Sequence, residues 1–215
     1  MKTFTPLIFD GYHGDSVSSF HDMKDAGIVL TIFKSSQRLS SDKAFNNFIS
    51  RAKSIDLLVG AYHFGGNASG VKQAQYFLSK LTEGTLMVLD FERYPSSQMT
   101  LSQAESFVEE VVKQTGNLPV LYYGELLNEK ERAGEISAKS ILRDCPAWVA
   151  RYSSSEPKFL SGQDLVMWQY TGDGVGPKPH RIAGCNNDAD LSIWVGNPDD
   201  IPRFVKKHSF RDTPA

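Results

Sequence analysis

Short apolar segments alternate along the chain with segments in which apolar residues recur every three or four positions. The first pattern predicts buried β-strands, and the second predicts amphipathic helices. The predicted strands cover residues 7–9, 28–33, 57–64, 86–91, 120–123, 147–152, 165–170 and 190–194. The predicted helices cover residues 17–25, 45–52 and 71–81, a stretch that starts near 102, and residues 138–143. Alternation of this kind is typical of βαβ units, so we expect a mostly parallel sheet.

The helix that follows residues 86–91 carries its own start and stop signals. Ser102 and Glu105 have the spacing of a capping box, in which each side chain bonds the backbone of the other residue. Gly116 is expected to end this helix, because glycine adopts the left-handed backbone of a helix C-terminus without strain.

The helical pattern weakens in the second half of the chain. Only residues 138–143 predict a helix there, and residues 171–187 form a loop rich in glycine and proline. The sequence therefore predicts an α/β fold, an irregular (β/α) barrel similar to a TIM barrel, with eight strands and fewer than eight helices.

Length and charge set limits on the function. A chain of 215 residues can bury a sizeable core, so we expect one domain over residues 1–215. The net charge of −2 and the scattered lysines and arginines argue against nucleic-acid binding. The short basic cluster of Arg203, Lys206 and Lys207 is interpreted as a solvated helix face. No membrane insertion is expected, because no long apolar segment is present.

Cys145 and Cys185 are too few for a disulfide framework and lack the spacing of a metal site. No secretory signal is recognised at the amino terminus, where residues 1–9 lead directly to Asp10. We therefore favour two buried free thiols over one disulfide, because a chain made without a leader folds in a reducing cytosol.

Four acidic residues lie at or near the ends of predicted strands: Asp10, Asp90, Glu92 and Asp190. The carboxyl ends of the strands of a parallel barrel open on one face, where active sites are built. We therefore expect these four side chains to converge on one site.

Asp90 and Glu92 are separated only by Phe91, so the pleat of a strand directs both carboxyl groups to one side. Their backbone positions are roughly 6.6 Å apart, close enough for one charge to raise the pKa of the other group. A protonated acid beside a second carboxylate is what glycoside hydrolysis requires. Most Asp-x-Glu pairs are solvated, but residues 86–89 are apolar throughout, which favours a functional cleft. The spacing leaves open whether configuration would be retained or inverted.

Aromatic residues gather near the same strand ends, among them Tyr62, Phe64, Tyr122, Trp148, Trp168 and Tyr170. The apolar faces of sugar rings stack on flat side chains, so this group favours a carbohydrate groove, although any single aromatic residue is more often part of a core. His13 and His63 have no second histidine at metal-ligand spacing and are interpreted as structural.

The chain resembles glycoside hydrolase family 25, the muramidases often called Chalaropsis-type lysozymes, over nearly its whole length. The segments that carry the resemblance are Phe9-Asp10, Gly60-Ala61-Tyr62-His63-Phe64, Leu89-Asp90-Phe91-Glu92, Leu121-Tyr122, Ala147-Trp148-Val149-Ala150-Arg151-Tyr152, Trp168-Gln169-Tyr170 and Ala189-Asp190-Leu191. The chain departs from the family at Asp10-Gly11-Tyr12-His13-Gly14, where a small hydroxyl residue and an amide usually follow the aspartate. It also departs at Asp190-Leu191-Ser192, where Asp188 could compete for the role of Asp190.

The resemblance implies a flattened barrel that cleaves the β-1,4 bond between N-acetylmuramic acid and N-acetylglucosamine in peptidoglycan, with retention of configuration. It makes Glu92 the general acid, with Asp90 assisting and Asp10 and Asp190 as outer carboxylates. Whether Asp90 attacks directly or steers the acetamido group of the substrate stays open. Candidate substrate contacts are Tyr62, Phe64, Tyr122, Trp148, Arg151, Trp168 and Tyr170. No metal or organic cofactor is implied.

Two other functions stay open at this point. A non-catalytic glycan-binding protein could use the same barrel, and a metal-dependent phosphodiesterase could use Asp90 and Glu92 as ligands of a divalent ion. For the favoured function we expect a monomer that acts at the bacterial cell wall, released by lysis or by a specialised secretion system, with an immunity or inhibitor protein as a candidate partner.

Overall fold

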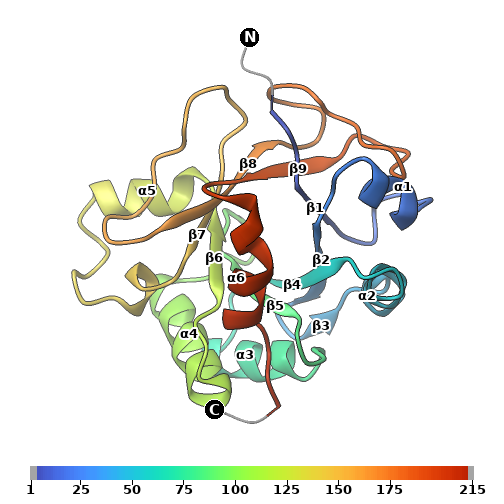
Figure 1. Cartoon of the computed structure of the whole chain (residues 1–215). Helices are drawn as coiled ribbons and strands as arrows, with labels where there is room; N and C mark the ends of the chain where they lie inside the picture. Colours follow the sequence, from blue (N-terminus) through green and yellow to red (C-terminus); the bar gives the residue numbers. More distant parts are fainter. Residues whose placement is uncertain (1–3, 213–215) are drawn as a thin grey trace.

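Eight strands close into a barrel in the computed structural model of the chain, which describes residues 4–212 (Figure 1). The barrel strands are β1 (Ile8–Gly11), β2 (Leu30–Gln37), β4 (Leu58–Phe64), β5 (Leu86–Asp90), β6 (Val120–Tyr123), β7 (Ala147–Ala150), β8 (Leu165–Thr171) and β9 (Asp190–Trp194). The barrel closes because β1 pairs with both β2 and β9. The short strand β3 (Ser40–Ser41) extends β2 as a hairpin outside this ring.

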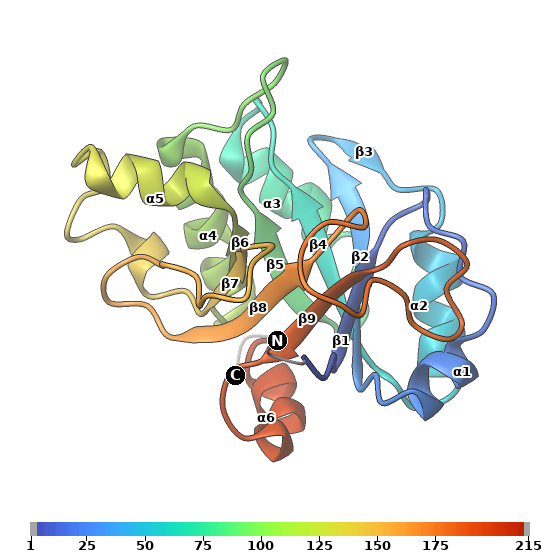
Figure 2. The same ribbon diagram turned by 90° about the horizontal axis from the view of Figure 1, so that it is seen from above.

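Six α-helices accompany the barrel in the part of the chain that the structure describes, which confirms the predicted irregular barrel with fewer than eight helices. They are α1 (Phe20–Asp25), α2 (Phe45–Lys53), α3 (Gly70–Leu78), α4 (Leu101–Thr115), α5 (Glu125–Arg132) and α6 (Ile201–Lys207). Helices α1 to α5 lie around the outside of the barrel, and α6 lies apart from them (Figure 2).

The alternation of side chains along each strand divides the apolar residues into two clusters. One residue set, including Phe9, Leu89 and Leu121, points outward and packs against the surrounding helices. The other set fills the barrel interior with Ile8, Leu30, Leu86, Val88, Val120 and Met167, and it includes Ile201 and Val205 of α6. Helix α6 therefore covers the end of the barrel where the parallel strands begin, which leaves the opposite end open.

Strand β9 differs from the expected parallel arrangement, because it runs antiparallel to both β1 and β8. Its first residue, Asp190, pairs in register with Asp10 of β1. The start of an antiparallel strand lies at the same end of the barrel as the carboxyl ends of its parallel neighbours. Asp190 thus reaches the open end from the beginning of its strand rather than from the end of one.

Several predicted boundaries in the helical regions are wrong. The capping box of α4 is formed by Thr100 and Gln103 rather than by Ser102 and Glu105, whose carboxylate instead accepts a hydrogen bond from Ser140. Gly116 ends α4 in the left-handed conformation, with φ of 72°, as predicted. Residues 138–143 contain only a 3₁₀ turn, Ile141–Arg143.

Helix α5 was not expected, because its sequence is mostly charged and buries only Leu127 and Asn128. Ion pairs link its residues to each other and to the following loops, including Arg132 with Glu125 and Lys130 with Glu135. Cys145 and Cys185 are both buried and unbridged, in line with the expectation of free thiols. None of the helices described is long and apolar enough to cross a membrane.

Replacement of Gly70 by alanine should destabilise the fold. Helices α3 and α4 approach so closely that a Cβ atom on Gly70 would lie 2.1 Å from the carbonyl oxygen of Gln103 and 3.0 Å from the backbone nitrogen of Phe107. Because backbone atoms cannot move aside cheaply, we expect a loss of about 1–3 kcal/mol in the free energy of unfolding. Urea denaturation should show a lower midpoint with an unchanged slope, whereas Lys72→Ala on the exposed face of α3 should change the midpoint little.

Candidate active site

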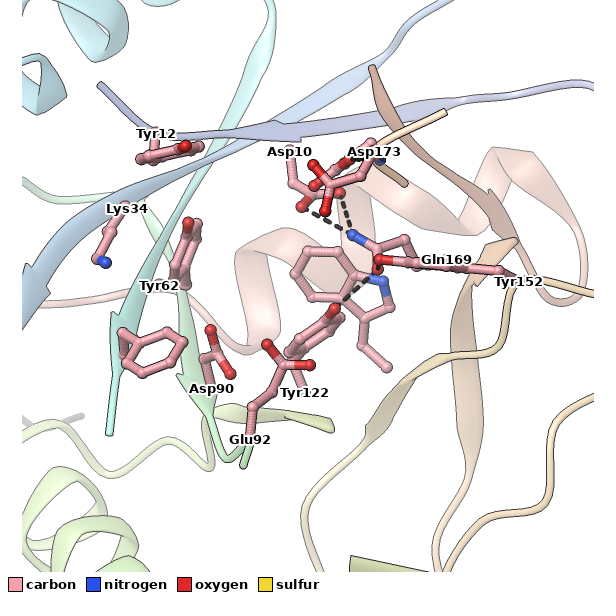
Figure 3. A pocket seen from close by; sticks show the side chains of 13 residues that line it. Asp10, Tyr12, Lys34, Tyr62, Asp90, Glu92, Tyr122, Tyr152, Gln169 and Asp173 are labelled. Atoms are coloured by element: carbon pink, nitrogen blue, oxygen red, sulfur yellow. Dashed lines mark hydrogen bonds between the residues drawn. The ribbon is translucent and has the colours of Figure 1, made fainter. Parts of the chain in front are cut away.

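A cavity of about 270 Å³ lies at the open end of the barrel (Figure 3). Its walls are formed by Asp10, Tyr12, Lys34, Tyr62, Phe64, Asp90, Glu92, Tyr122, Trp148, Tyr152, Gln169, Asp173 and Asp190. All four predicted acidic residues are among them, together with four of the seven predicted substrate contacts: Tyr62, Phe64, Tyr122 and Trp148.

Strand register brings these side chains together. Asp90 ends β5 and pairs in register with Phe64 of β4 and Tyr122 of β6. Leu89 and Phe91 point outward into the helix-facing cluster, so Asp90 and Glu92 both point inward. Figure 3 shows their carboxyl groups side by side at one end of the cavity. The side chains of Asp90 and Glu92 therefore meet in one cavity, as the sequence predicts.

Asp90 is almost fully buried, with 4% of its surface exposed. Its Oδ1 atom has no hydrogen-bond partner within residues 4–212. Burial raises the pKa of Asp90 well above its ordinary value, the Glu92 charge raises it further, and the Lys34 ammonium opposes the shift. A buried carboxylate oxygen without a donor is costly, so this atom is suited to accept a hydrogen bond from a bound molecule.

The carboxyl group of Glu92 has a pKa near neutral pH. Burial raises its pKa to about 7, and the nearby Asp173 carboxylate contributes to the shift. An acid with such a pKa holds its proton in a substantial share of molecules at pH 7 and can donate it to a reacting group.

Gln169 connects the Asp10 carboxylate to two tyrosines of the cavity wall. Its amide nitrogen donates to both carboxylate oxygens of Asp10, at 3.0 and 2.9 Å. Its amide oxygen accepts hydrogen bonds from the hydroxyl groups of Tyr122 at 2.7 Å and Tyr152 at 3.0 Å. Every polar atom of this buried amide is therefore engaged, which fixes its orientation and holds Asp10 in place.

Asp10 and Asp190 face each other across the β1–β9 pair. Burial and the charge of Asp190 raise the pKa of Asp10, while the hydrogen bond from Gln169 opposes this. Burial raises the pKa of Asp190 to about 7, although the backbone N–H of Asp173 donates to its Oδ1 atom at 3.1 Å. Asp188, the alternative to Asp190, does not line the cavity and pairs instead with Arg181.

Three predicted substrate contacts lie outside the cavity: Arg151, Trp168 and Tyr170. Trp168 and Tyr170 flank the inward-pointing Gln169 on β8, so the strand pleat turns both rings toward the outer cluster, where they pack against Phe4. Arg151 follows the end of β7 with an exposed side chain, and its backbone oxygen accepts the indole N–H of Trp168.

Five residues of the cavity were missed as site residues: Tyr12, Lys34, Tyr152, Gln169 and Asp173. Gln169 could have been found from strand alternation, since it lies between two aromatic residues that point the other way. Lys34 could have been found in the same manner, because Ile32 of the same strand faces the barrel interior. Asp173 lies in a loop that carries no periodic pattern.

The two histidines are hydrogen-bonded, as predicted. His63 is buried between Ser36 Oγ at 2.9 Å and Gln73 Oε1 at 3.1 Å, and burial lowers its pKa to about 4. His13 contacts Asp42 outside the active-site cavity. Within residues 4–212, no group of three or more His, Cys, Asp or Glu side chains is arranged to hold a metal ion.

Comparison with known proteins gives a family match over most of the chain. The model of the glycosyl hydrolases family 25 matches residues 9–178. The chain is 26% identical over 235 aligned positions to the uncharacterized protein YegX of Escherichia coli K12, covering 100% of this chain and 80% of that protein. It is 22% identical to an autolytic lysozyme of Clostridium acetobutylicum, covering 85% of this chain and 53% of that protein.

Solved structures show the same fold. The bacterial lysozyme from Streptomyces coelicolor matches with a TM-score of 0.81 at 24% identity, covering 95% of this chain and 99% of that chain. A family GH25 lysozyme from Aspergillus fumigatus matches with a TM-score of 0.74 at 24% identity, covering 92% and 97%. The similarity of the barrel thus extends over nearly the full length of both proteins.

Proposed function

The chain belongs to the glycosyl hydrolases of family 25, and on that premise we propose that this glycoside hydrolase is an N-acetylmuramidase. It would cleave the β-1,4 bond between N-acetylmuramic acid and N-acetylglucosamine in the glycan strand of peptidoglycan. The observation that carries this proposal is the pair of adjacent carboxyl groups, Asp90 and Glu92, at the open end of the barrel. Their surroundings differ, as the two roles in glycoside hydrolysis require.

Glu92 is the general acid in this proposal. Its pKa of about 7 lets it carry a proton to the leaving glycosidic oxygen near neutral pH and then accept one from the incoming water. Its place beside Asp90, with Tyr122 behind it, leaves the carboxyl group facing the cavity (Figure 3).

Asp90 stabilises positive charge at the reacting sugar carbon. The Lys34 ammonium favours the ionised form of Asp90, against the effects of burial and of the Glu92 charge. Asp90 lines the cavity, and its buried Oδ1 atom has no hydrogen-bond partner among the described residues. An acetamido N–H of the substrate would satisfy that oxygen, and its carbonyl oxygen could then reach the sugar carbon. Both this route and direct attack by Asp90 proceed with retention, which we propose as the stereochemical outcome.

Aromatic side chains supply the surface for the sugar rings. Trp148 and Tyr122 are nearly fully buried, pack edge to face at 4.5 Å and support the cavity wall from behind, and Trp148 Nε1 donates to Ser192 Oγ. Tyr62 and Phe64 line the wall beside Asp90, and the half-exposed Tyr12 stands at the rim. Sugar rings stack on such faces while the surrounding carboxylates, including Asp10 and Asp190, accept their hydroxyl groups.

Mass spectrometry of fragments released from purified peptidoglycan tests the proposal. Muramic acid at the new reducing ends is the expected product, and glucosamine ends would place the cleavage at the other bond. Binding without new reducing ends would support the glycan-binding alternative, and loss of activity in chelator would support the phosphodiesterase alternative. We further propose that the chain acts on the cell wall as a single-domain monomer.

The rate should depend on pH through Glu92. Because the acid is active only when protonated, kcat/KM should fall about tenfold per pH unit above its pKa of about 7. The Asp173→Asn variant removes a negative charge that raises this pKa, so its alkaline limb should move to lower pH. Initial rates between pH 5 and pH 9 at constant ionic strength give the alkaline limb of the pH profile for the wild type and for the variant. An alkaline limb that stays in place in the variant would remove Asp173 from this role.

A further inference from the structure

A second, smaller cavity opens beside the active-site cavity. It has a volume of about 190 Å³ and is lined chiefly by His13, Lys34, Gln37, Ser40, Asp42 and Lys43. Its residues come from the end of β2, from β3, from the loop that leads to α2 and from the loop after β1. Lys34 lines both cavities, so the two share a wall. We call this space the side cavity.

The two cavities carry opposite charge. Five carboxyl groups line the active-site cavity, and Lys34 is the one basic side chain among its described lining residues. The side cavity has the lysines Lys34 and Lys43 together with His13, against the single carboxylate of Asp42. An anion would therefore be repelled from the first space and attracted to the second.

The carboxylate of Asp42 is already occupied. Its side chain is 1% exposed, and its Oδ2 atom lies 2.5 Å from Nδ1 of His13 while also accepting the backbone N–H of His13 at 3.3 Å. Its Oδ1 atom accepts the backbone N–H of Ala44 at 2.9 Å. Asp42 thus orients the His13 ring, which is 42% exposed, and leaves Nε2 without a hydrogen-bond partner in the described chain.

The lysine ammonium groups of the side cavity still have free donors. Lys34 Nζ donates to Gln37 Oε1 at 2.7 Å, which uses one of its three N–H groups, and stands 4.8 Å from the centre of the Phe64 ring. Lys43 has no ion pair among the described residues, and its side chain is exposed. Figure 3 shows Lys34 beside Tyr12 and Tyr62, next to the wall where sugar rings would stack.

We propose that the side cavity binds a carboxylate carried by the muramic acid substituent of the substrate, and so selects muramyl glycan over neutral glycan. This inference rests on the proposed function. Muramic acid differs from glucosamine by a lactyl ether that projects from the sugar ring. Its carboxyl group is either free or joined to a peptide that carries carboxylates of its own. Both sources present the same anion to Lys34, Lys43 and His13.

Lys43→Gln is the variant of choice, because Lys43 lies outside the active-site cavity and away from Asp90. We expect KM on muramyl glycan to rise roughly fivefold with kcat within about twofold of the wild type, the scale of one solvent-accessible charged hydrogen bond. A neutral N-acetylglucosamine oligomer, used as substrate or as competitive inhibitor, should bind the variant and the wild type equally. Lys206→Gln on α6, at the closed end of the barrel, removes the same charge and should change neither value.

A comparison of two substrates, glycan with and without its peptides, identifies which carboxylate binds in the side cavity. If the effect persists on glycan stripped of peptide, the lactyl carboxylate is the ligand; if it needs intact peptides, their carboxylates are. An unchanged KM in Lys43→Gln, or an equal rise on neutral oligomer or in Lys206→Gln, overturns the proposal. Wild-type protein that releases no muramic ends refutes the muramidase function separately. In that case calorimetry with N-acetylmuramic acid and N-acetylglucosamine, on wild type and Lys43→Gln, decides the side cavity by itself.

Discussion

Replacement of Glu92 by glutamine should lower kcat on purified peptidoglycan by at least about 10²-fold, the usual scale of general acid catalysis. Glutamine keeps the size and shape of the side chain but has no proton to give to the leaving oxygen. KM should change much less, because the cavity walls formed by Tyr62, Phe64 and Trp148 stay as they are. Release of reducing ends under initial-rate conditions, over a range of substrate concentrations, separates the two parameters.

Two controls distinguish a loss of catalysis in Glu92→Gln from a loss of folded protein. Glu125→Gln changes the same group on α5, where the side chain is exposed and paired with Arg132, and should leave the rate near that of the wild type. Glu92→Gln itself should unfold at no lower urea concentration than the wild type at pH 8, because it removes a charge that burial disfavours. Near-normal turnover in a folded Glu92→Gln protein would remove Glu92 from the acid role.

The barrel could be predicted from the sequence because its strands have strong local patterns. Residues 86–90 are apolar up to the aspartate, and alternation with helical segments fixes the order of βα units. The antiparallel direction of β9 could not be predicted, since a strand of five residues has no pattern that distinguishes its two directions. Helix α5 was missed because ion pairs and a few buried contacts stabilise it, rather than an apolar face.

The site was predictable where strand position alone decides which way a side chain points. Asp10, Asp90 and Glu92 were found because each lies within two residues of the carboxyl end of a strand. Trp168 and Tyr170 were placed wrongly because the sequence shows that aromatic residues alternate with Gln169 but does not show which set faces inward. Aromatic residues are typical of sugar sites, so Trp168 and Tyr170 were preferred as site residues. In the barrel, however, the side chain that points inward is that of Gln169, whose amide group donates to Asp10.

The side cavity could not be predicted from the sequence. His13 and Asp42 are 29 positions apart, and nothing in either segment indicates that they touch. Their contact depends on the hairpin of β2 and β3, which places the following loop beside the loop after β1. Lys34 gains its position between two cavities from the same hairpin. A cluster built from two strands and two loops is a tertiary feature, so periodicity cannot reveal it.

Replacement of Asp90 by asparagine should lower kcat by at least about 10²-fold and at the same time make the protein more stable near neutral pH. Activity falls because asparagine cannot stabilise positive charge at the sugar carbon. Stability rises because Asp90 is 4% exposed and has an oxygen without a donor. The folded protein holds the Asp90 proton to higher pH than the unfolded chain does, so its stability falls as pH rises above the ordinary aspartate pKa of 3.8. The neutral asparagine does not contribute to that fall.

The opposite signs of these two effects distinguish Asp90 from a structural residue, whose loss would lower activity and stability together. Urea midpoints at pH 4 and pH 8 should differ less in Asp90→Asn than in the wild type, and kcat at saturating peptidoglycan gives the catalytic loss. Asp188→Asn serves as the matched control, because Asp188 is exposed, pairs with Arg181 and should change neither quantity appreciably. A less stable Asp90→Asn protein at pH 8 would mean that Asp90 holds the fold rather than serving the reaction, since a side chain kept for catalysis is expected to cost stability where it is buried.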